Sequence, residues 1–233
     1  MIPLYRTAAV RAGLGPCLRP GGETLTRRIL ELVRPAADAL ILDAGCGTGA
    51  SMSLLSAHGI KTVLGLDLDP DLLAEARQNH NTVARADLAL LPLPDGCLEL
   101  ILCECVWNLT EKKAVLAEFS RSLAPGGHLA LSDIYARGDA PENGKWPVRC
   151  CFSQATGLEE VRDLFLDAGL SVEVLEDHTT LLTRTAAEFV FTHGSLKGFW
   201  QAVTGDETLA ADACDAAAAS RPGLFLLIAR KQE

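Results

Sequence analysis

The sequence predicts an α/β fold in which one doubly wound, mostly parallel sheet of seven strands is covered by helices. Three observations predict it. Short apolar runs alternate with helical segments, as in chains that build parallel sheets through right-handed crossovers. The runs are apolar almost throughout, which is typical of strands buried on both faces. The chain of 233 residues is 48% hydrophobic and 22% charged, which is typical of a packed domain.

The predicted elements follow in order along the chain. The strands are the short apolar runs at 39–43, 62–66, 82–85, 98–103, 128–132, 171–175 and 224–229. The helices between them are expected at 24–33, in the 50s up to His58, and at 71–79, 111–123, 158–168 and 186–203. The Pro125-Gly126-Gly127 breaker is expected to end the fourth of these crossover helices. The alanine-rich segment 210–219 fits either a helix or a surface loop.

The net charge and the lack of targeting signals limit the kinds of binding partner and the cellular compartment that we expect. The net charge is −9 and the pI is near 5.1, and such a field repels the phosphate backbone of nucleic acids. We therefore expect a small-molecule substrate and no nucleic acid. Neither a signal peptide nor an apolar run of membrane-spanning length is visible, so we expect a cytoplasmic protein with no membrane contact. In that reducing compartment the eight cysteines are free thiols or ligands rather than disulfides. The oligomeric state is left open between monomer and homodimer.

The turn after the first strand carries the strongest motif, DAGCGTG at 43–49. Glycines at alternate positions let the backbone turn sharply and approach a ligand closely. The same run also fits a dinucleotide fingerprint, so an NAD(P)-binding dehydrogenase is one alternative. However, Asp43 stands before the first glycine, where a carboxylate suits a cationic ligand and gains nothing beside a pyrophosphate. The acid therefore favours a positively charged ligand.

Further acids follow the next two strands. Asp67 ends the second strand about 20 residues after the glycine turn, the separation at which an acid reaches a ribose hydroxyl. Asp87 follows the third strand. Taken singly, Asp67 fits a helix cap equally well, and Asp87 fits a surface turn better than a binding site. Together, at successive strand ends, they favour a nucleoside site.

With these motifs the chain resembles the class I, Rossmann-like S-adenosylmethionine-dependent methyltransferases of the methyltransferase-11 type. The resemblance covers roughly residues 38–134 and rests on LDAGCGTG at 42–49, GLDLD at 65–69, AD at 86–87, PLPDG at 92–96 and LAPGG at 123–127. It implies an enzyme that uses S-adenosyl-L-methionine, and a final antiparallel strand at 224–229. It also implies that the glycine loop and Asp43 hold the amino-acid part of the cofactor, Asp67 the ribose and Asp87 the adenine. The candidate cofactor residues are Asp43, Gly45, Cys46, Gly47, Gly49, Asp67, Leu68, Asp87 and Leu88.

On the acceptor side, residues 105–135 are similar to arsenite methyltransferases, through CVWNL at 105–109 and LSDIY at 131–135. The resemblance implies that trivalent arsenic binds to Cys105 and to a second thiol, Cys150 or Cys151, and soft thiolates suit such an element. Each of these three candidate catalytic thiols fits packing equally well. A further cysteine of that family follows a Tyr-Tyr-Gly stretch, which is absent here, and only Cys17 could replace it. No histidine pair has metal-binding helical spacing, so no metal is assigned.

The resulting hypothesis divides the chain into two parts. Residues 1–37 form a helical leader that could fold over the cofactor as a lid, and residues 38–233 form the methyltransferase domain. Within that domain, 135–223 carries acceptor-side insertions. The predicted function is methyl transfer to a small molecule, which is thiol-bound arsenite, a similar soft species or an ordinary nucleophile. A non-catalytic S-adenosylmethionine-binding protein is the second alternative.

Overall fold

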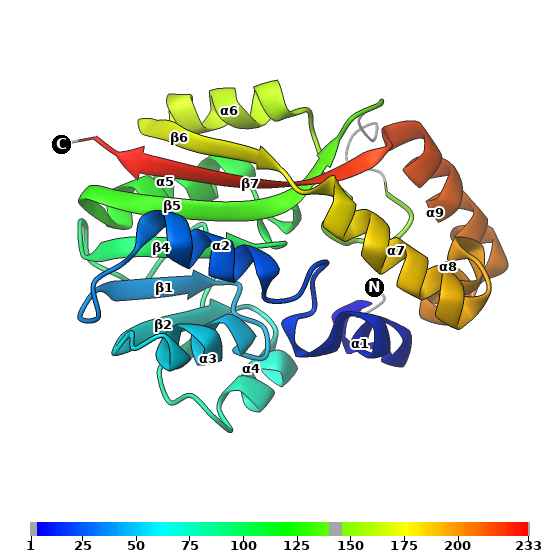
Figure 1. The fold of residues 1–233 in the computed structure, drawn as a ribbon, viewed down its shortest axis with the longest axis horizontal. Helices are drawn as coiled ribbons and strands as arrows, with labels where there is room; N and C mark the ends of the chain where they lie inside the picture. The colour runs from blue at the N-terminus through cyan, green and yellow to red at the C-terminus, as the bar shows by residue number, and fades with distance from the viewer. Residues whose placement is uncertain (1–3, 140–145, 233) are drawn as a thin grey trace.

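All seven predicted strands form one sheet in a computed structural model that describes residues 4–139 and 146–232 (Figure 1). The strand order is β3-β2-β1-β4-β5-β7-β6. The strands are β1 Leu40–Ala44, β2 Thr62–Asp67, β3 Val83–Arg85, β4 Leu98–Glu104, β5 Leu123–Ala136, β6 Leu170–Asp177 and β7 Pro222–Lys231.

The order of the strands determines where a ligand can bind. β1 pairs in parallel with β2 on one side and with β4 on the other, so the chain reverses its direction of winding between β1 and β4. At such a switch point the loops beyond the strand ends separate and leave a crevice. β7 is antiparallel to both β5 and β6. The predicted α/β class and the final antiparallel strand are therefore confirmed.

Helices cover both faces of the sheet. α2, α3 and α4 bury Ile29, Leu55 and Leu73 against one face, and α5 and α6 bury Phe119 and Phe165 against the other. Each helix presents an apolar stripe to the sheet, as amphipathic helices do. These five helices are α2 Thr24–Val33, α3 Ala50–Ala57, α4 Pro70–Ala76, α5 Lys112–Ser122 and α6 Leu158–Asp167.

A third apolar cluster lies at the end of the sheet where the parallel strands terminate. Here α1 gathers beside α7, α8 and α9, so the start of the chain lies beside its later part (Figure 1). Trp146, Cys150 and Trp200 are buried in this cluster. The helices are α1 Ala8–Leu14, α7 Thr179–His193, α8 Leu196–Thr204 and α9 Glu207–Ser220, and the short 3-10 turns are η1 Leu4–Arg6, η2 Gly15–Cys17 and η3 Trp107–Leu109.

Two predicted elements were wrong in detail. The helix expected over 186–203 is two helices, because Gly194 has a φ of +78° and the Ser195 hydroxyl caps α8 by accepting from the Gly198 N–H. The Pro125-Gly126-Gly127 breaker does not end a helix. α5 already ends at Ser122, and β5 begins at Leu123 and runs through the breaker with a register shift against β4.

Segment 210–219, for which helix and loop were both open, lies within helix α9. None of the helices in the described part of the chain has the length and apolar character needed to cross a membrane.

Candidate functional site

A cavity of about 490 Å³ opens at the switch point beyond β1 and β4. Its volume lies in the range of small-molecule sites. Its walls come from the ends of β1, β2 and β4, from the turn after β3, and from the N-terminal segment. Every predicted cofactor residue except Gly49 lines it: Asp43, Gly45, Cys46, Gly47, Asp67, Leu68, Asp87 and Leu88.

The glycine loop is held against β2 by its backbone. The N–H groups of Gly45 and Cys46 both donate to the Leu66 carbonyl, at 2.7 and 3.0 Å. Gly45 has a φ of +80°, and a Cβ there would lie 2.3 Å from a methyl group of Val106. Only glycine meets both constraints. Gly49 does not line the cavity; it is the N-cap of α3, with a φ of +84°.

Asp43 is the acid most in need of a partner. Its side chain is buried, and its Oδ2 has no hydrogen-bond partner within residues 4–139 and 146–232. Burial, together with the nearby Glu104, raises the pKa of Asp43 to about 7, and Arg19 opposes the rise. A buried acceptor without a donor is costly. A cationic ligand in the cavity, such as the ammonium group of an amino acid, would supply the donor.

The other two acids are tied to backbone donors. Asp67 accepts from the Gly47 N–H at 2.9 Å through Oδ2 and from the Asp69 N–H at 2.8 Å through Oδ1. Each carboxylate oxygen keeps a further lone pair for a hydroxyl. Asp87 is exposed, and its Oδ1 accepts from the Ala89 N–H at 2.9 Å. These bonds orient both side chains at the rim of the cavity.

A buried ion pair that the sequence analysis missed completes this end of the cavity. Arg19 Nη2 lies 3.0 Å from Glu104 Oε2, and both residues line the cavity. The Ser51 and Thr26 hydroxyls bridge the two charged groups at 2.7 to 3.1 Å. The sequence did carry one signal, an acid at the end of the apolar run 98–103. With Asp43, Arg19 provides one cation and one anion for a zwitterionic amino-acid group.

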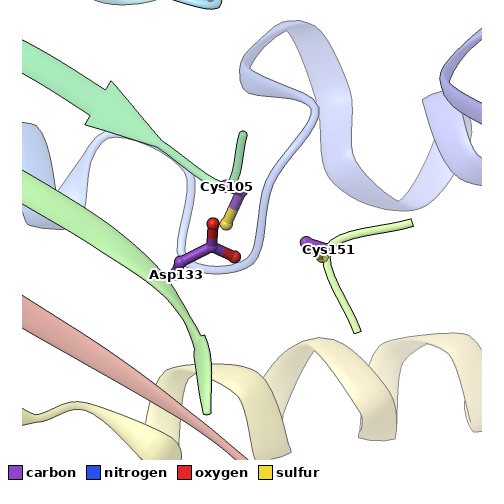
Figure 2. Close-up of side chains that lie close together, drawn as sticks. All are labelled: Cys105, Asp133 and Cys151. Carbon is purple, nitrogen blue, oxygen red and sulfur yellow. The ribbon is translucent and has the colours of Figure 1, made fainter. Parts of the chain in front are cut away.

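Two of the candidate thiols meet at the other end of the site. Cys105 follows β4 with a φ of +57°, which is uncommon for a residue with a side chain. Cys151 lies in the loop before α6. The Sγ atoms of Cys105 and Cys151 and a carboxylate oxygen of Asp133 all lie within 4.8 Å of one another. Figure 2 shows the Cys105 thiol and the Asp133 carboxylate facing each other, with Cys151 across from them.

The remaining thiols lie apart from this group. Cys150 is buried in the third cluster with Trp146 and Trp200, and like Cys151 it does not line the cavity. Cys17 lines the cavity, but on the side of Arg19. The structure therefore brings the Cys105 sulfur together with that of Cys151, while the Cys150 sulfur lies outside this group.

Burial determines the protonation of Cys105 and Asp133 in the group that they form with Cys151. The contact with Cys151 and then burial raise the pKa of the Cys105 thiol well above its usual range. Burial raises the pKa of Asp133 to about 7, against hydrogen bonds from Asn108 and Ile134 that lower it. The Cys105 thiol is therefore neutral and protonated in the free protein near pH 7.

Asn108 holds the cluster together and was also missed. Its Nδ2 donates to the Cys151 and Ile134 carbonyls, both at 2.7 Å, and to Asp133 Oδ1 at 3.1 Å. Arg149 also donates to the Leu109 carbonyl at 2.6 Å. These bonds tie the loop that carries Cys151 to the segment that carries Cys105. The asparagine of the CVWNL motif thus positions the second thiol.

Comparison with known proteins agrees with this geometry. Residues 42–131 match the family model of the methyltransferase domain. Within this segment the chain is similar to methyltransferase domains. The match confirms the predicted resemblance to S-adenosylmethionine-dependent methyltransferases. It does not favour the dehydrogenase alternative.

The relatives differ in the acceptors their names state. Trans-aconitate 2-methyltransferase of Methylobacterium nodulans is 41% identical over 117 residues, covering 48% of this chain and 43% of the relative. Arsenite methyltransferase of Halobacterium salinarum is 28% identical over 149 residues, covering 58% and 38%. The chain thus spans less than half the length of either relative, and the names of the two relatives state different acceptors.

The fold is shared with solved methyltransferases. The structure of phosphoethanolamine N-methyltransferase 2 from Haemonchus contortus matches with a TM-score of 0.76 at 18% identity, covering 97% of this chain and 56% of that one. At this identity the likeness concerns the fold alone.

Proposed function

We propose that this methyltransferase transfers the methyl group of S-adenosylmethionine to a small-molecule acceptor bound beside Cys105. One observation carries the proposal: a single cavity is lined both by the predicted cofactor residues and by Cys105. Positioning a nucleophile next to a reactive group supplies much of the rate of such a transfer. A cavity that joins the two binding regions provides that positioning.

The chain's own residues divide the work along the cavity. Bound S-adenosylmethionine supplies a methyl group that its positively charged sulfur makes electrophilic. Asp43 and Arg19 would hold the zwitterionic amino-acid end, and Asp67 the ribose hydroxyls. The buried acid Glu104 keeps Arg19 in place. These contacts leave the Cys105 end of the cavity for the acceptor.

For the acceptor we propose a soft, thiophilic species, with arsenite as the first candidate. Two buried thiols whose Sγ atoms lie within 4.8 Å of each other match the preference of trivalent arsenic for sulfur. Arsenite condenses with two thiols by forming two S–As bonds, and the two thiol protons leave with two arsenite hydroxyls as two waters. The Cys105 thiol is neutral here, and the condensation itself creates no net charge. Methyl transfer would then form an As–C bond from the arsenic lone pair while the methyl–sulfur bond of the cofactor breaks.

Replacing Asp67 by Ala tests the cofactor site. We expect the affinity for S-adenosylhomocysteine, the demethylated cofactor, to fall by at least about 1 kcal/mol, because a ribose hydroxyl loses its acceptor. Isothermal titration calorimetry measures this loss. Asp163→Ala, an exposed acid on α6, is the matched control and should bind as the wild type does. Equal affinities for both variants would contradict the assignment of Asp67.

The pH dependence of binding tests Asp43. Its pKa of about 7 means that the side chain is protonated below pH 7, whereas a bound ammonium group requires the carboxylate. Affinity for S-adenosylhomocysteine should therefore fall as the pH drops below 7, approaching about tenfold per pH unit. Asp43→Asn should bind weakly with a much flatter profile between pH 5.5 and 8. A wild-type profile that is flat over this range would argue against Asp43 as the ligand of the ammonium group.

The proposal as a whole is tested by binding and turnover together. We expect S-adenosylmethionine to bind, NADH not to bind, and arsenite to be methylated when a small thiol is present. Cofactor binding without turnover over a broad acceptor panel would favour the non-catalytic alternative. Turnover of another acceptor, with no use of arsenite, would refute the soft acceptor and keep the enzyme.

A further inference from the structure

The hydroxyl of Tyr5 is a buried polar group that the cofactor site does not use. Tyr5 lies in η1, and Leu4, Tyr5 and Arg6 line the cavity together with Cys105. Its oxygen is out of contact with solvent and has no hydrogen-bond partner in the described part of the chain. Buried hydroxyls are normally paired. An unpaired one at a cavity wall indicates a bound group that pairs with it.

The Tyr5 hydroxyl lies near the thiols beside which we propose that the acceptor binds. The ring packs against the third cluster, which contains Cys150. Burial raises the pKa of Tyr5 well above its usual range, and the nearby Cys151, Cys150, Cys105 and Asp133 raise it further. The phenol is therefore a protonated hydrogen-bond donor near the two thiols and the carboxylate.

The same neighbours do not surround Cys17. The groups that influence its thiol are Arg19, Glu23 and Glu104, all on the cofactor side. Cys17 therefore does not take the place of a third thiol beside Cys105 and Cys151, and from the N-terminal segment it is Tyr5 that lies near them.

Ion pairs hold the N-terminal segment over the cavity. Arg6 binds both carboxylate oxygens of Asp69, at 2.9 and 2.6 Å, and also pairs with Asp71. Arg11 binds Glu75 through two bonds of 2.8 and 2.7 Å. The acids lie on α4 and its N-cap, directly after Asp67. Partly exposed pairs of this kind are weak enough to open and close.

We propose that Tyr5 is a positioning residue whose hydroxyl donates a hydrogen bond to an oxygen of the acceptor held on Cys105 and Cys151. Residues 4–14 act as a cap that the Arg6 and Arg11 pairs hold in place. This inference rests on the proposed soft acceptor. Arsenite bound to two thiols keeps one hydroxyl, and that oxygen would accept the bond from Tyr5. The cap thus favours bound arsenic compounds that keep a hydroxyl over those that have none.

Two arsenic reagents test this contact directly. Phenylarsine oxide bridges two thiols by losing one water and then has no hydroxyl left, whereas bound arsenite keeps one. Affinities of both for the S-adenosylhomocysteine-loaded protein are measured by calorimetry. We expect Tyr5→Phe to weaken arsenite binding about tenfold, to change phenylarsine oxide binding less than twofold, and to leave S-adenosylhomocysteine binding unchanged.

The matched control is Tyr135→Phe, since that hydroxyl already donates to Asp177 at 2.8 Å and lies outside the cavity lining. It should bind both reagents as the wild type does. Arg6→Ala keeps Tyr5 but weakens the cap, and it should lower arsenite affinity about threefold. If the wild type binds arsenite and Tyr5→Phe binds it equally well, the role of Tyr5 is refuted. If the wild type binds neither reagent, the soft-acceptor assignment is refuted and this inference with it.

Discussion

Arg19→Met should lower the free energy of unfolding by about 3–5 kcal/mol, the largest stability effect that we expect. The substitution keeps much of the side-chain volume but leaves Glu104 as a buried charge without a partner. The Thr26 and Ser51 hydroxyls, which bridge the pair, lose a donor as well. Urea denaturation followed by tryptophan fluorescence measures the change. S-adenosylhomocysteine affinity should fall too, since Arg19 lines the cavity.

Two further variants separate the buried charge from other effects. Arg27→Met removes an exposed arginine that pairs with Glu23 on the surface, and it should cost less than about 1 kcal/mol. The double variant Arg19→Met with Glu104→Gln removes both charges and should recover much of the lost stability. A double variant as unstable as Arg19→Met alone would show that packing, rather than the unpaired carboxylate, sets the cost.

Cys105→Ser should reduce arsenite methylation by roughly 100-fold while changing S-adenosylhomocysteine affinity less than threefold. Binding through two linked contacts exceeds binding through one by about 10²–10⁴-fold, and the serine hydroxyl is a poor ligand for arsenic. Serine keeps the size of cysteine and a β carbon at the same strained backbone position. Initial rates with arsenite and a small thiol, set beside calorimetry of the cofactor product, measure both quantities.

The other cysteines supply the comparison for this prediction. Cys151→Ser should resemble Cys105→Ser, because the two sulfurs lie in one group. Cys150→Ser should lower stability rather than methylation, since Cys150 is buried in the third cluster. If Cys105→Ser keeps most of the arsenite activity, the thiol pair is not the acceptor site, and methylation by this chain proceeds through other groups.

The sequence was sufficient to predict the sheet and the acids that line the rim of the cavity. Apolar runs of strand length, glycines where the backbone needs a positive φ, and acids at successive strand ends are local features, and they mark positions directly. In a parallel sheet the strand ends meet at one edge, so Asp43, Asp67 and Asp87 had to lie near one another once the strands were located.

Only the tertiary structure showed which side chains from distant parts of the chain contact one another at the site. Whether Cys150 or Cys151 faces Cys105 depends on how Asn108 holds a loop more than 40 positions away in the chain. Arg19 and Tyr5 come from a leader with no motif, and only packing brings them to Glu104 and to the thiols. Contacts of this kind depend on the three-dimensional path of the chain, and no pattern in a single sequence encodes the distance between side chains on separate elements.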